Sequence, residues 1–319
     1  MIIAMCCTRN WYFYLLTNLY ALFKHNKVEK VYLFIEDDEI PYLRDERIEF
    51  ININKTKRYV KKISPNYNTR YSKMSYIRCY FSKLLKESKI LYIDADAIVV
   101  DDIQDLWDID LKYYALAGIK ENGEWSRHLG IEGMNDKYIN SGVLLMNLDL
   151  IRKEKIDDAM IYLLNKKFYL FPDQDVINVV CKDRIKYVSN IYNSTETTGV
   201  VNNAKVIHYI REKKGWIKSS PRSNVWFRYY NEMIERNEGK MVKVKCIQSY
   251  TDLKLNKVIT PKDEPFVVDD ERAKQLVNAK VCEVVEVIKA EPIEEPKVEE
   301  PVEELVEEVK PKKTTRRKK

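Results

Sequence analysis

The first half of the chain alternates short apolar runs with amphipathic stretches, and this alternation limits the folds that it can adopt. Strands that alternate with helices form a largely parallel sheet with helices on both faces. We therefore predict an α/β fold whose ligands bind beyond the carboxyl ends of the strands. The expected strands are Ile2–Cys6, Val31–Ile35, Ile48–Ile53, Ile90–Ile93, Tyr113–Ile119 and Val143–Met146, and the expected helices are Tyr12–Lys24, Tyr71–Lys86 and Leu150–Asn165.

The composition excludes several classes of protein. Only 8 glycines and 10 prolines occur among 319 residues, so the chain is not collagen-like. No apolar stretch reaches the roughly 18 residues of a transmembrane helix, and we expect no transmembrane segment. The formal net charge of +6 comes from 55 Lys+Arg against 49 Asp+Glu, a balance that does not indicate a nucleic-acid partner.

The cysteines and the N-terminus point to a reducing compartment. None of the six cysteines forms a CxxC pair, and most lie in apolar runs, as free buried thiols do. The first residues lack the basic and long apolar regions of a secretory signal. We therefore expect the protein in the cytoplasm, with a membrane surface or a phage particle as alternative points of attachment.

The character of the sequence changes near residue 240. Met241 opens an alternating strand-like run, Asp269–Ala279 resembles a short helix with an acidic cap, and Val281–Ile288 is again strand-like. Beyond it, residues 291–319 contain 9 Glu, 8 Lys+Arg and 4 Pro and no aromatic residue, a composition typical of disorder. We predict a large domain over 1–237, a small α+β module over 240–289 and a disordered tail over 290–319.

The sharpest chemical feature is an apolar strand that ends in Asp94-Ala95-Asp96. If the strand continued, the two-residue spacing would place both carboxylates on one face. Two neighbouring carboxylates repel each other, and a divalent cation resolves the conflict. Oxygen ligands with open positions suit Mg²⁺ or Mn²⁺ held jointly with a phosphate, so we predict a metal site here.

Other polar groups follow or open predicted elements. His208 lies at the exit of a short apolar run, and Lys214 and Trp216 follow it, which suits a third metal ligand beside an anion pocket. Asn140-Ser141 opens a buried strand. Asp173 and Gln174 stand at the start of a helix, where we expect Asp173 to be the cap.

In this order the motifs resemble those of family 8 glycosyltransferases, which are retaining enzymes with a Rossmann-like GT-A fold. The resemblance covers roughly residues 1–235. The residues that carry it are Arg78 in a helix before the metal strand, Asp94 and Asp96, Asn140-Ser-Gly-Val, Asp173-Gln-Asp-Val-Ile-Asn, and His208 with Lys214 six and Trp216 eight positions later.

The resemblance implies a role for each matching residue. It assigns Asp94, Asp96 and His208 to Mn²⁺ or Mg²⁺, and Lys214 to the diphosphate of a UDP-sugar. Around the donor it places Asn10, Trp11, Arg78, Asp94, Ala95, Asp96, Ser141 and Lys214, and it makes Asn140, Asp173 and Gln174 the catalytic candidates.

The expected reaction is metal-dependent transfer of a hexose, glucose or galactose, from a UDP-sugar with retention of configuration. The acceptor is a glycan, of lipopolysaccharide or teichoic type, or a protein. Two features depart from the family pattern: Thr8-Arg9 replaces acidic residues after the first strand, and Arg211 and Gly215 replace a glycine and a proline after His208.

Two other classes of protein share part of these features. Asp94-Ala-Asp-Ala-Ile resembles the opening motif of haloacid-dehalogenase-type phosphohydrolases, whose first Asp is a nucleophile. The C-terminal module and tail resemble appendages of bacteriophage structural proteins. A non-catalytic sugar-nucleotide-binding or particle-associated adaptor, docking a partner through the module, is therefore the alternative function.

Overall fold

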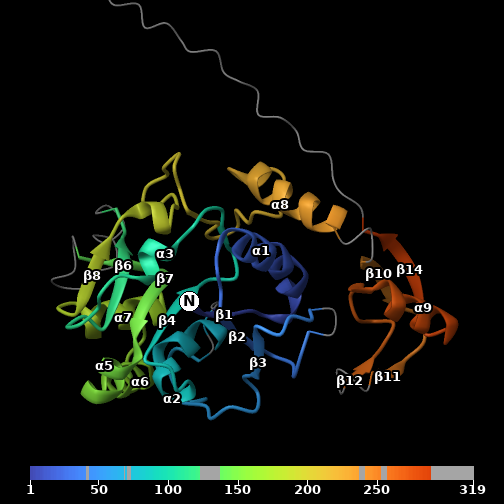
Figure 1. Ribbon diagram of the computed structural model, residues 1–319. Coiled ribbons are helices and arrows are strands. Elements are labelled where there is room, and N and C mark those ends of the chain that lie inside the picture. The colour runs from blue at the N-terminus through green and yellow to red at the C-terminus, as the bar shows by residue number, and fades with distance from the viewer. Residues whose placement is uncertain are drawn as a thin grey trace, which may run out of the picture.

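The computed structural model describes residues 1–40, 43–67, 69, 73–122, 137–236, 241–252 and 257–288 (Figure 1). The tail predicted at 290–319 lies outside these residues. Within them, no helix is both long enough and apolar enough to cross a membrane.

One seven-stranded sheet forms the centre of the large domain, in the order β3-β2-β1-β4-β7-β6-β8. Strands β3, β2, β1 and β4 run parallel, β7 is antiparallel to both of its neighbours, and β6 and β8 are parallel. The predicted α/β fold with a mostly parallel sheet is therefore confirmed. The strands are β1 Ile2–Cys6, β2 Lys30–Ile35, β3 Ile48–Asn52, β4 Lys89–Ile93, β6 Leu116–Lys120, β7 Ile139–Asn147 and β8 Ile185–Val188.

Helices cover both faces of this sheet, so alternate side chains of one strand enter two different hydrophobic clusters. In β1, Ile3 and Met5 pack in one cluster, while Ala4 and Cys6 pack in the other. Burial on both faces explains why the strands are continuous apolar runs. The helical elements are η1 Arg9–Trp11, α1 Tyr12–His25, η2 Lys73–Tyr80, α2 Phe81–Leu84, α3 Gln104–Trp107, α5 Leu148–Glu154, α6 Ile156–Lys166, α7 Pro172–Cys181, η3 Asn190–Tyr192 and α8 Ser223–Arg236.

Two predicted helices differ from the observed ones. The stretch expected as one helix over Tyr71–Lys86 is a 3₁₀ helix over Lys73–Tyr80 followed by a single α-turn. Arg78 Nε donates 3.1 Å to the carbonyl of Ser75, an oxygen that an α-helix would offer to its own backbone. The helix expected over Leu150–Asn165 is two helices, because Lys155 between them has a φ of 56° and ends the first.

The C-terminal module is α+β, as predicted. Strands β10 Met241–Cys246, β13 Phe266–Asp269 and β14 Cys282–Val287 form an antiparallel sheet in the order β13-β10-β14. Helix α9 Asp270–Asn278 begins at the cap Asp269, whose carboxylate accepts a 2.7 Å hydrogen bond from the amide of Arg272. Strands β11 Tyr250–Asp252 and β12 Lys257–Ile259 form a separate hairpin. The module has its own hydrophobic cluster, and its boundary with the large domain stays a prediction.

All six cysteine thiols should stay unreactive until the protein unfolds. Each thiol is free and buried, and burial raises the pKa of Cys181 to about 12. Because the thiolate is the reactive form, we expect a thiol-specific chromogenic reagent to titrate at most about one thiol in the native protein and all six in denaturant. Rapid reaction of several native thiols would contradict the burial described above.

Candidate active site

The Asp94–Asp96 segment is a turn and not an extension of the strand. β4 ends at Ile93, and the next strand, β5, begins at Ala97. The strand thus does not continue through the two aspartates, and it is the turn that brings their carboxylates together. Its backbone is held firmly, because Asn18 Nδ2 donates 2.6 Å to the carbonyl of Ala95 and the amide of Asp94 donates 2.8 Å to that of Gly142.

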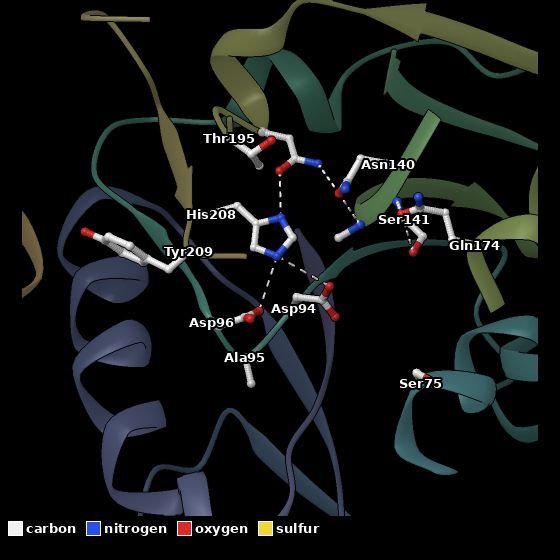
Figure 2. A network of polar contacts seen from close by, with 12 residues as sticks. Ser75, Asp94, Ala95, Asp96, Asn140, Ser141, Gln174, Thr195, His208 and Tyr209 are labelled. Carbon is white, nitrogen blue, oxygen red and sulfur yellow. Dashed lines mark hydrogen bonds and ion pairs between the residues drawn. The ribbon is translucent and has the colours of Figure 1, made fainter. Parts of the chain in front are cut away.

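Strand pairing brings His208 to this turn. β5 (Ala97–Val99) is antiparallel to β9 (Val206–His208), and His208 lies directly opposite Ala97. Its Nε2 is 3.3 Å from an oxygen of Asp96 and 3.7 Å from one of Asp94 (Figure 2). One ligand atom from each of these three residues lies within 4.8 Å of the others. Two carboxylates and an imidazole in such a cluster are donors that fit Mn²⁺, and fit Mg²⁺ less well because of the nitrogen.

A side-chain amide orients the imidazole. His208 Nδ1 is 2.9 Å from Asn193 Oδ1, and Asn193 Nδ2 in turn donates 2.8 Å to Asn140 Oδ1. Because an amide oxygen only accepts, Nδ1 carries a proton and donates to Asn193, and Nε2 is the ring nitrogen that faces the carboxylates and can ligate a cation. Gly142 makes room for the ring, since a Cβ there would lie 2.1 Å from His208 Cε1.

A buried guanidinium compensates the carboxylates on the other side. Arg78 NH2 lies 2.7 Å from Asp94 Oδ1, and its Nε lies 3.3 Å from Asp173 Oδ2. NH1 donates 2.8 Å to the carbonyl of Ser141. Burial alone would lower the pKa of Arg78, but Asp94, the phenol of Tyr92 and Asp173 outweigh it and raise that pKa, so the residue stays charged.

Lys214 forms an ion pair with Asp96. Its ammonium binds Asp96 Oδ2 and donates 3.0 Å to the carbonyl of Tyr209. Burial would raise the pKa of Asp96, but Lys214 and His208 outweigh it and hold the pKa below its ordinary value. The same ammonium lies 5.0 Å from the ring centroid of Trp11, so the side chains of Lys214 and Trp11 are neighbours.

Asn140, Ser141, Asp173 and Gln174 meet where β7 begins beside α7. Gln174 Oε1 accepts 2.9 Å from the amide of Ser141, and Glu121 Oε1 accepts 2.8 Å from Asn140 Nδ2 and 3.4 Å from Gln174 Nε2. Figure 2 shows Asn140, Ser141 and Gln174 on the side of His208 away from Ala95. The structure thus brings the three catalytic candidates beside the metal cluster.

The expected capping role of Asp173 was wrong. Phe171 occupies the N-cap of α7 and Pro172 its first turn, so the carboxylate of Asp173 faces Arg78 instead. Its side chain is 8% exposed, and burial raises its pKa despite the opposing charge of Arg78. A proline at the first helical position needs no amide partner, which leaves Asp173 free for this contact.

The loop after β1 contains the departure at Thr8-Arg9. Asn10 is exposed, whereas Arg9 forms an ion pair with the buried carboxylate of Asp37, at 2.8 Å through Nε. Tyr12 also donates to Asp37, at 3.1 Å. An acidic residue is therefore present beside this loop, although it comes from the end of β2 and not from the end of β1.

Sequence reasoning missed several residues that build the site. Glu121, Asn193 and Asn18 contact the predicted residues through one or two side-chain hydrogen bonds each, across long separations in sequence. Such contacts leave no periodic pattern. The only local signals are that Glu121 lies just after the predicted strand Tyr113–Ile119 and that Asn193 opens a polar cluster.

Comparison with known proteins identifies the family. The sequence model of Glycosyl transferase family 8 matches residues 2–220, well over half of the chain. The chain belongs to this family. The match includes every site residue described above and ends before the C-terminal module. Membership of this family argues against the phosphohydrolase alternative.

Curated proteins from several bacteria are similar to this family 8 chain. It is 30% identical over 169 residues to a putative glycosyltransferase of Haemophilus influenzae, covering 47% of this chain and 51% of the relative. It is 26% identical over 212 residues to general stress protein A of Bacillus subtilis, covering 57% and 72%. It is 29% identical over 151 residues to the lipopolysaccharide glucosyltransferase WaaO of Escherichia coli, covering 41% and 44%. The chain thus spans about half the length of two of these three relatives.

A solved structure supports the fold of this family 8 chain. The galactosyltransferase LgtC, in complex with donor and acceptor sugar analogues, aligns with a TM-score of 0.54 at 20% identity. The alignment covers 72% of this chain and 94% of LgtC. It confirms the predicted GT-A fold.

Replacing Asn193 with alanine should weaken Mn²⁺ binding by about 10- to 100-fold, because the imidazole of His208 would lose the partner that fixes its tautomer and orientation. Isothermal titration with Mn²⁺ measures this directly. Asn190→Ala is the matched control, because Asn190 lies in the same segment but donates to the carbonyl of Thr198, at 3.3 Å. Equal affinities of the two variants would contradict the role of Asn193.

Proposed function

We propose that this chain transfers a hexose from a UDP-sugar to an acceptor hydroxyl, with retention of configuration and in dependence on a divalent cation. The observation that carries the proposal is the cluster of Asp94, Asp96 and His208 with Lys214 beside it. Carboxylates and imidazole suit a cation, and a cation together with an ammonium suits a diphosphate. Family membership makes a nucleotide-sugar the expected source of that diphosphate.

The cation would be held by Asp94, Asp96 and His208, since their donor atoms fit Mn²⁺. When bound, it would stabilise the negative charge that develops on the leaving diphosphate. Asp94 keeps its position through Arg78, and His208 keeps its position through Asn193. These contacts hold Asp94 and His208 in place before any cation arrives, which limits the reorganisation that binding requires.

Lys214 would serve the phosphate end of the donor. In the structure its ammonium neutralises Asp96. Once a divalent cation satisfies that carboxylate, Lys214 has no strong partner there and becomes available for a phosphate oxygen. Trp11 lies beside this ammonium and Trp216 contacts Trp11, with ring centroids 5.2 Å apart. We assign the nucleoside to the side of Asn10 and Trp11.

The sugar would lie between the cation and α7. Arg78, Ser141 and Asp173 are bonded to one another and form a rigid wall, whereas Gln174 Nε2 makes only long contacts of 3.3–3.4 Å with Tyr138 and Glu121. With Oε1 held by the amide of Ser141, Nε2 of Gln174 is therefore the group best able to donate to a sugar hydroxyl. Asn140 acts through its neighbours, because both ends of its amide are already hydrogen-bonded.

The same contacts favour front-face attack over an enzymic nucleophile. Asp173 is tied to Arg78, and Glu121 accepts from Asn140, so neither of these two carboxylates is poised to attack. In the proposed step the anomeric C–O bond to the β-phosphate breaks. The acceptor oxygen forms its new bond on the same face, and its proton passes to the departing phosphate oxygen. The sugar passes through an oxocarbenium-like state.

The names of similar proteins support a hexose donor. WaaO is a glucosyltransferase that acts on lipopolysaccharide, and LgtC is a galactosyltransferase. We propose glucose or galactose as the transferred sugar and a glycan hydroxyl as the acceptor. Discrimination between the two sugars depends on a single hydroxyl configuration and hence on the fit near Gln174.

Release of UDP from a panel of UDP-sugars is the direct test of this function. Slow hydrolysis of the donor requires no acceptor, so we expect Mn²⁺-dependent release from UDP-glucose or UDP-galactose, and loss of release with a chelator. Release from neither sugar, together with no binding of UDP and Mn²⁺ by calorimetry, would leave the adaptor function as the better explanation.

The control for the metal cluster is a pair of matched variants. Asp96→Ala should reduce metal-dependent release by at least about a hundredfold, because it removes a ligand and the partner of Lys214. Asp183→Ala removes an exposed carboxylate elsewhere on the surface and should leave release unchanged. Thermal unfolding of both variants checks that the fold persists, and an active Asp96→Ala protein would remove the metal assignment.

Retention is tested on the product. With an accepted sugar alcohol or glycan, proton NMR of the first turnovers should show the α-anomer from an α-linked UDP-sugar. Front-face attack requires this outcome because the new bond forms on the face that the diphosphate leaves. Initial formation of the β-anomer would overturn the proposed mechanism.

A further inference from the structure

We propose that the face built by residues 54–67 with Lys73 and residues 162–170 docks the protein on the surface of an anionic lipid bilayer. We call it the basic–aromatic face. The proposal is independent of the reaction proposed above, because it concerns a surface whose residues make no contact with the metal cluster.

The charge of the chain is concentrated in this region. From Phe50 to Lys86 the sequence contains ten Lys and Arg residues and neither Asp nor Glu. Residues 159–172 also lack acidic side chains and add Lys166 and Lys167. The modest net charge of +6 for the whole chain therefore conceals a strongly cationic stretch. A field of one sign over one face attracts a surface of the opposite sign.

The fold places the two stretches side by side. Lys61, Ser64, Asn66 and the backbone near them exchange six hydrogen bonds with residues 161–169, among them a 2.6 Å bond from Ser64 Oγ to the carbonyl of Leu164. In Figure 1 the stretch after β3 passes along the lower side of the domain toward α2, on the side where α6 also lies. The cations of both stretches therefore belong to one surface.

The cations on this face are exposed and interleaved with aromatic rings. Of the eight cations on this face, Lys55 pairs with Asp38, and the other seven form no ion pair with a carboxylate within the part of the chain that the structure describes. Lys73 lies 4.1 Å from the ring centroid of Tyr67 and, by hydrogen bonding, lowers the pKa of Tyr67, with Arg58 and Lys62 adding to the effect. The seven cations are Lys57, Arg58, Lys61, Lys62, Lys73, Lys166 and Lys167.

Four large apolar side chains in the same two stretches are exposed. Ile63 is 88% exposed, Tyr162 61%, Phe168 59% and Leu170 51%. Single exposed apolar residues are ordinary on protein surfaces. Here, however, they belong to the two stretches that also carry the cations, and cations around apolar and aromatic side chains are typical of proteins that lie in a membrane interface.

The apolar residues favour a bilayer over other polyanions. A nucleic acid or an acidic polysaccharide would be attracted by the lysines but would gain nothing from Ile63 or Leu170. An anionic bilayer interacts favourably with both the cations and the apolar side chains. Its surface potential attracts the ammonium groups, and the boundary of its acyl region accepts the apolar side chains.

The face also adjoins the candidate active site along the chain. Leu170 precedes Asp173 by three residues, and Lys73 opens the 3₁₀ helix that carries Arg78. Docking through this face would hold the site close to the membrane surface.

Vesicle sedimentation with the full chain tests the proposal. We expect binding to phosphatidylcholine vesicles that contain about one third phosphatidylglycerol, and no binding to phosphatidylcholine alone. Binding should weaken at least about tenfold when NaCl is raised from about 0.1 M to about 1 M, because salt screens exposed charges. No binding to the anionic vesicles would overturn the proposal, and so would equal binding to both.

Charge-reversal variants locate the surface. The quadruple variant Lys57→Glu, Arg58→Glu, Lys61→Glu and Lys62→Glu should lower the partition coefficient by at least about a hundredfold. The control Lys27→Glu, Lys112→Glu, Lys182→Glu and Lys262→Glu changes the net charge equally at exposed lysines outside this face and should bind far more tightly. Equal loss in both variants would show an effect of net charge alone and would contradict a specific face.

The apolar variant separates a bilayer from a soluble polyanion. Ile63→Ser with Phe168→Ser and Leu170→Ser should weaken vesicle binding about tenfold or more and leave binding to heparin unchanged. If vesicle and heparin binding stayed equal to those of the unmodified chain, the apolar side chains would have no role and the lipid proposal would fail. Circular dichroism confirms folding of each variant, and no readout here depends on nucleotide or sugar.

Discussion

The compensation of buried negative charge at the edge of the sheet is the constraint on which the rest of the site depends. Asp94, Asp96 and Asp173 lie close together, and carboxylates withdrawn from water are tolerated only when cations neutralise them. Arg78 lies between Asp94 and Asp173, and Lys214 binds Asp96. Arg78 is buried and holds two carboxylates, whereas Lys214 pairs with one. In the proposed function, Arg78 is the fixed charge and Lys214 is the one that leaves its carboxylate when a cation binds.

The sheet topology gathers these groups from distant parts of the chain. Because β7 runs against β4, the end of β4 meets the beginning of β7, and Asp94 comes to lie beside Ser141 and Gly142. The short pair of β5 and β9 then delivers His208 to the same edge. Each contributing segment is a strand terminus or a turn anchored in a buried core. The sheet therefore fixes the positions of these side chains.

Much of this arrangement was predictable from the sequence because it rests on local patterns. Apolar runs gave six of the seven strands of the central sheet within a few residues, but neither β8 nor the short β5. Motif spacing identified Asp94, Asp96 and His208, which the structure brings together. Strand direction was not predictable, since alternation of residues is the same in either direction. Nor was the partner of Arg9, because its ion pair with Asp37 joins two loops that only the parallel pairing of β1 and β2 makes neighbours.

A continuous line of side chains runs from His208 through Asn193, Asn140 and Glu121 to Gln174. Each amide in it both donates and accepts, so the direction of one hydrogen bond dictates the direction of the next. The carboxylate of Glu121 only accepts, so it holds the amide nitrogens of both Asn140 and Gln174 toward itself. Through Asn140 and Asn193 it also places a proton on Nδ1 of the imidazole. A substitution of Glu121 would therefore release the orientation of both amides at once, whereas a substitution of Gln174 would leave the branch from Asn140 through Asn193 to His208 unchanged.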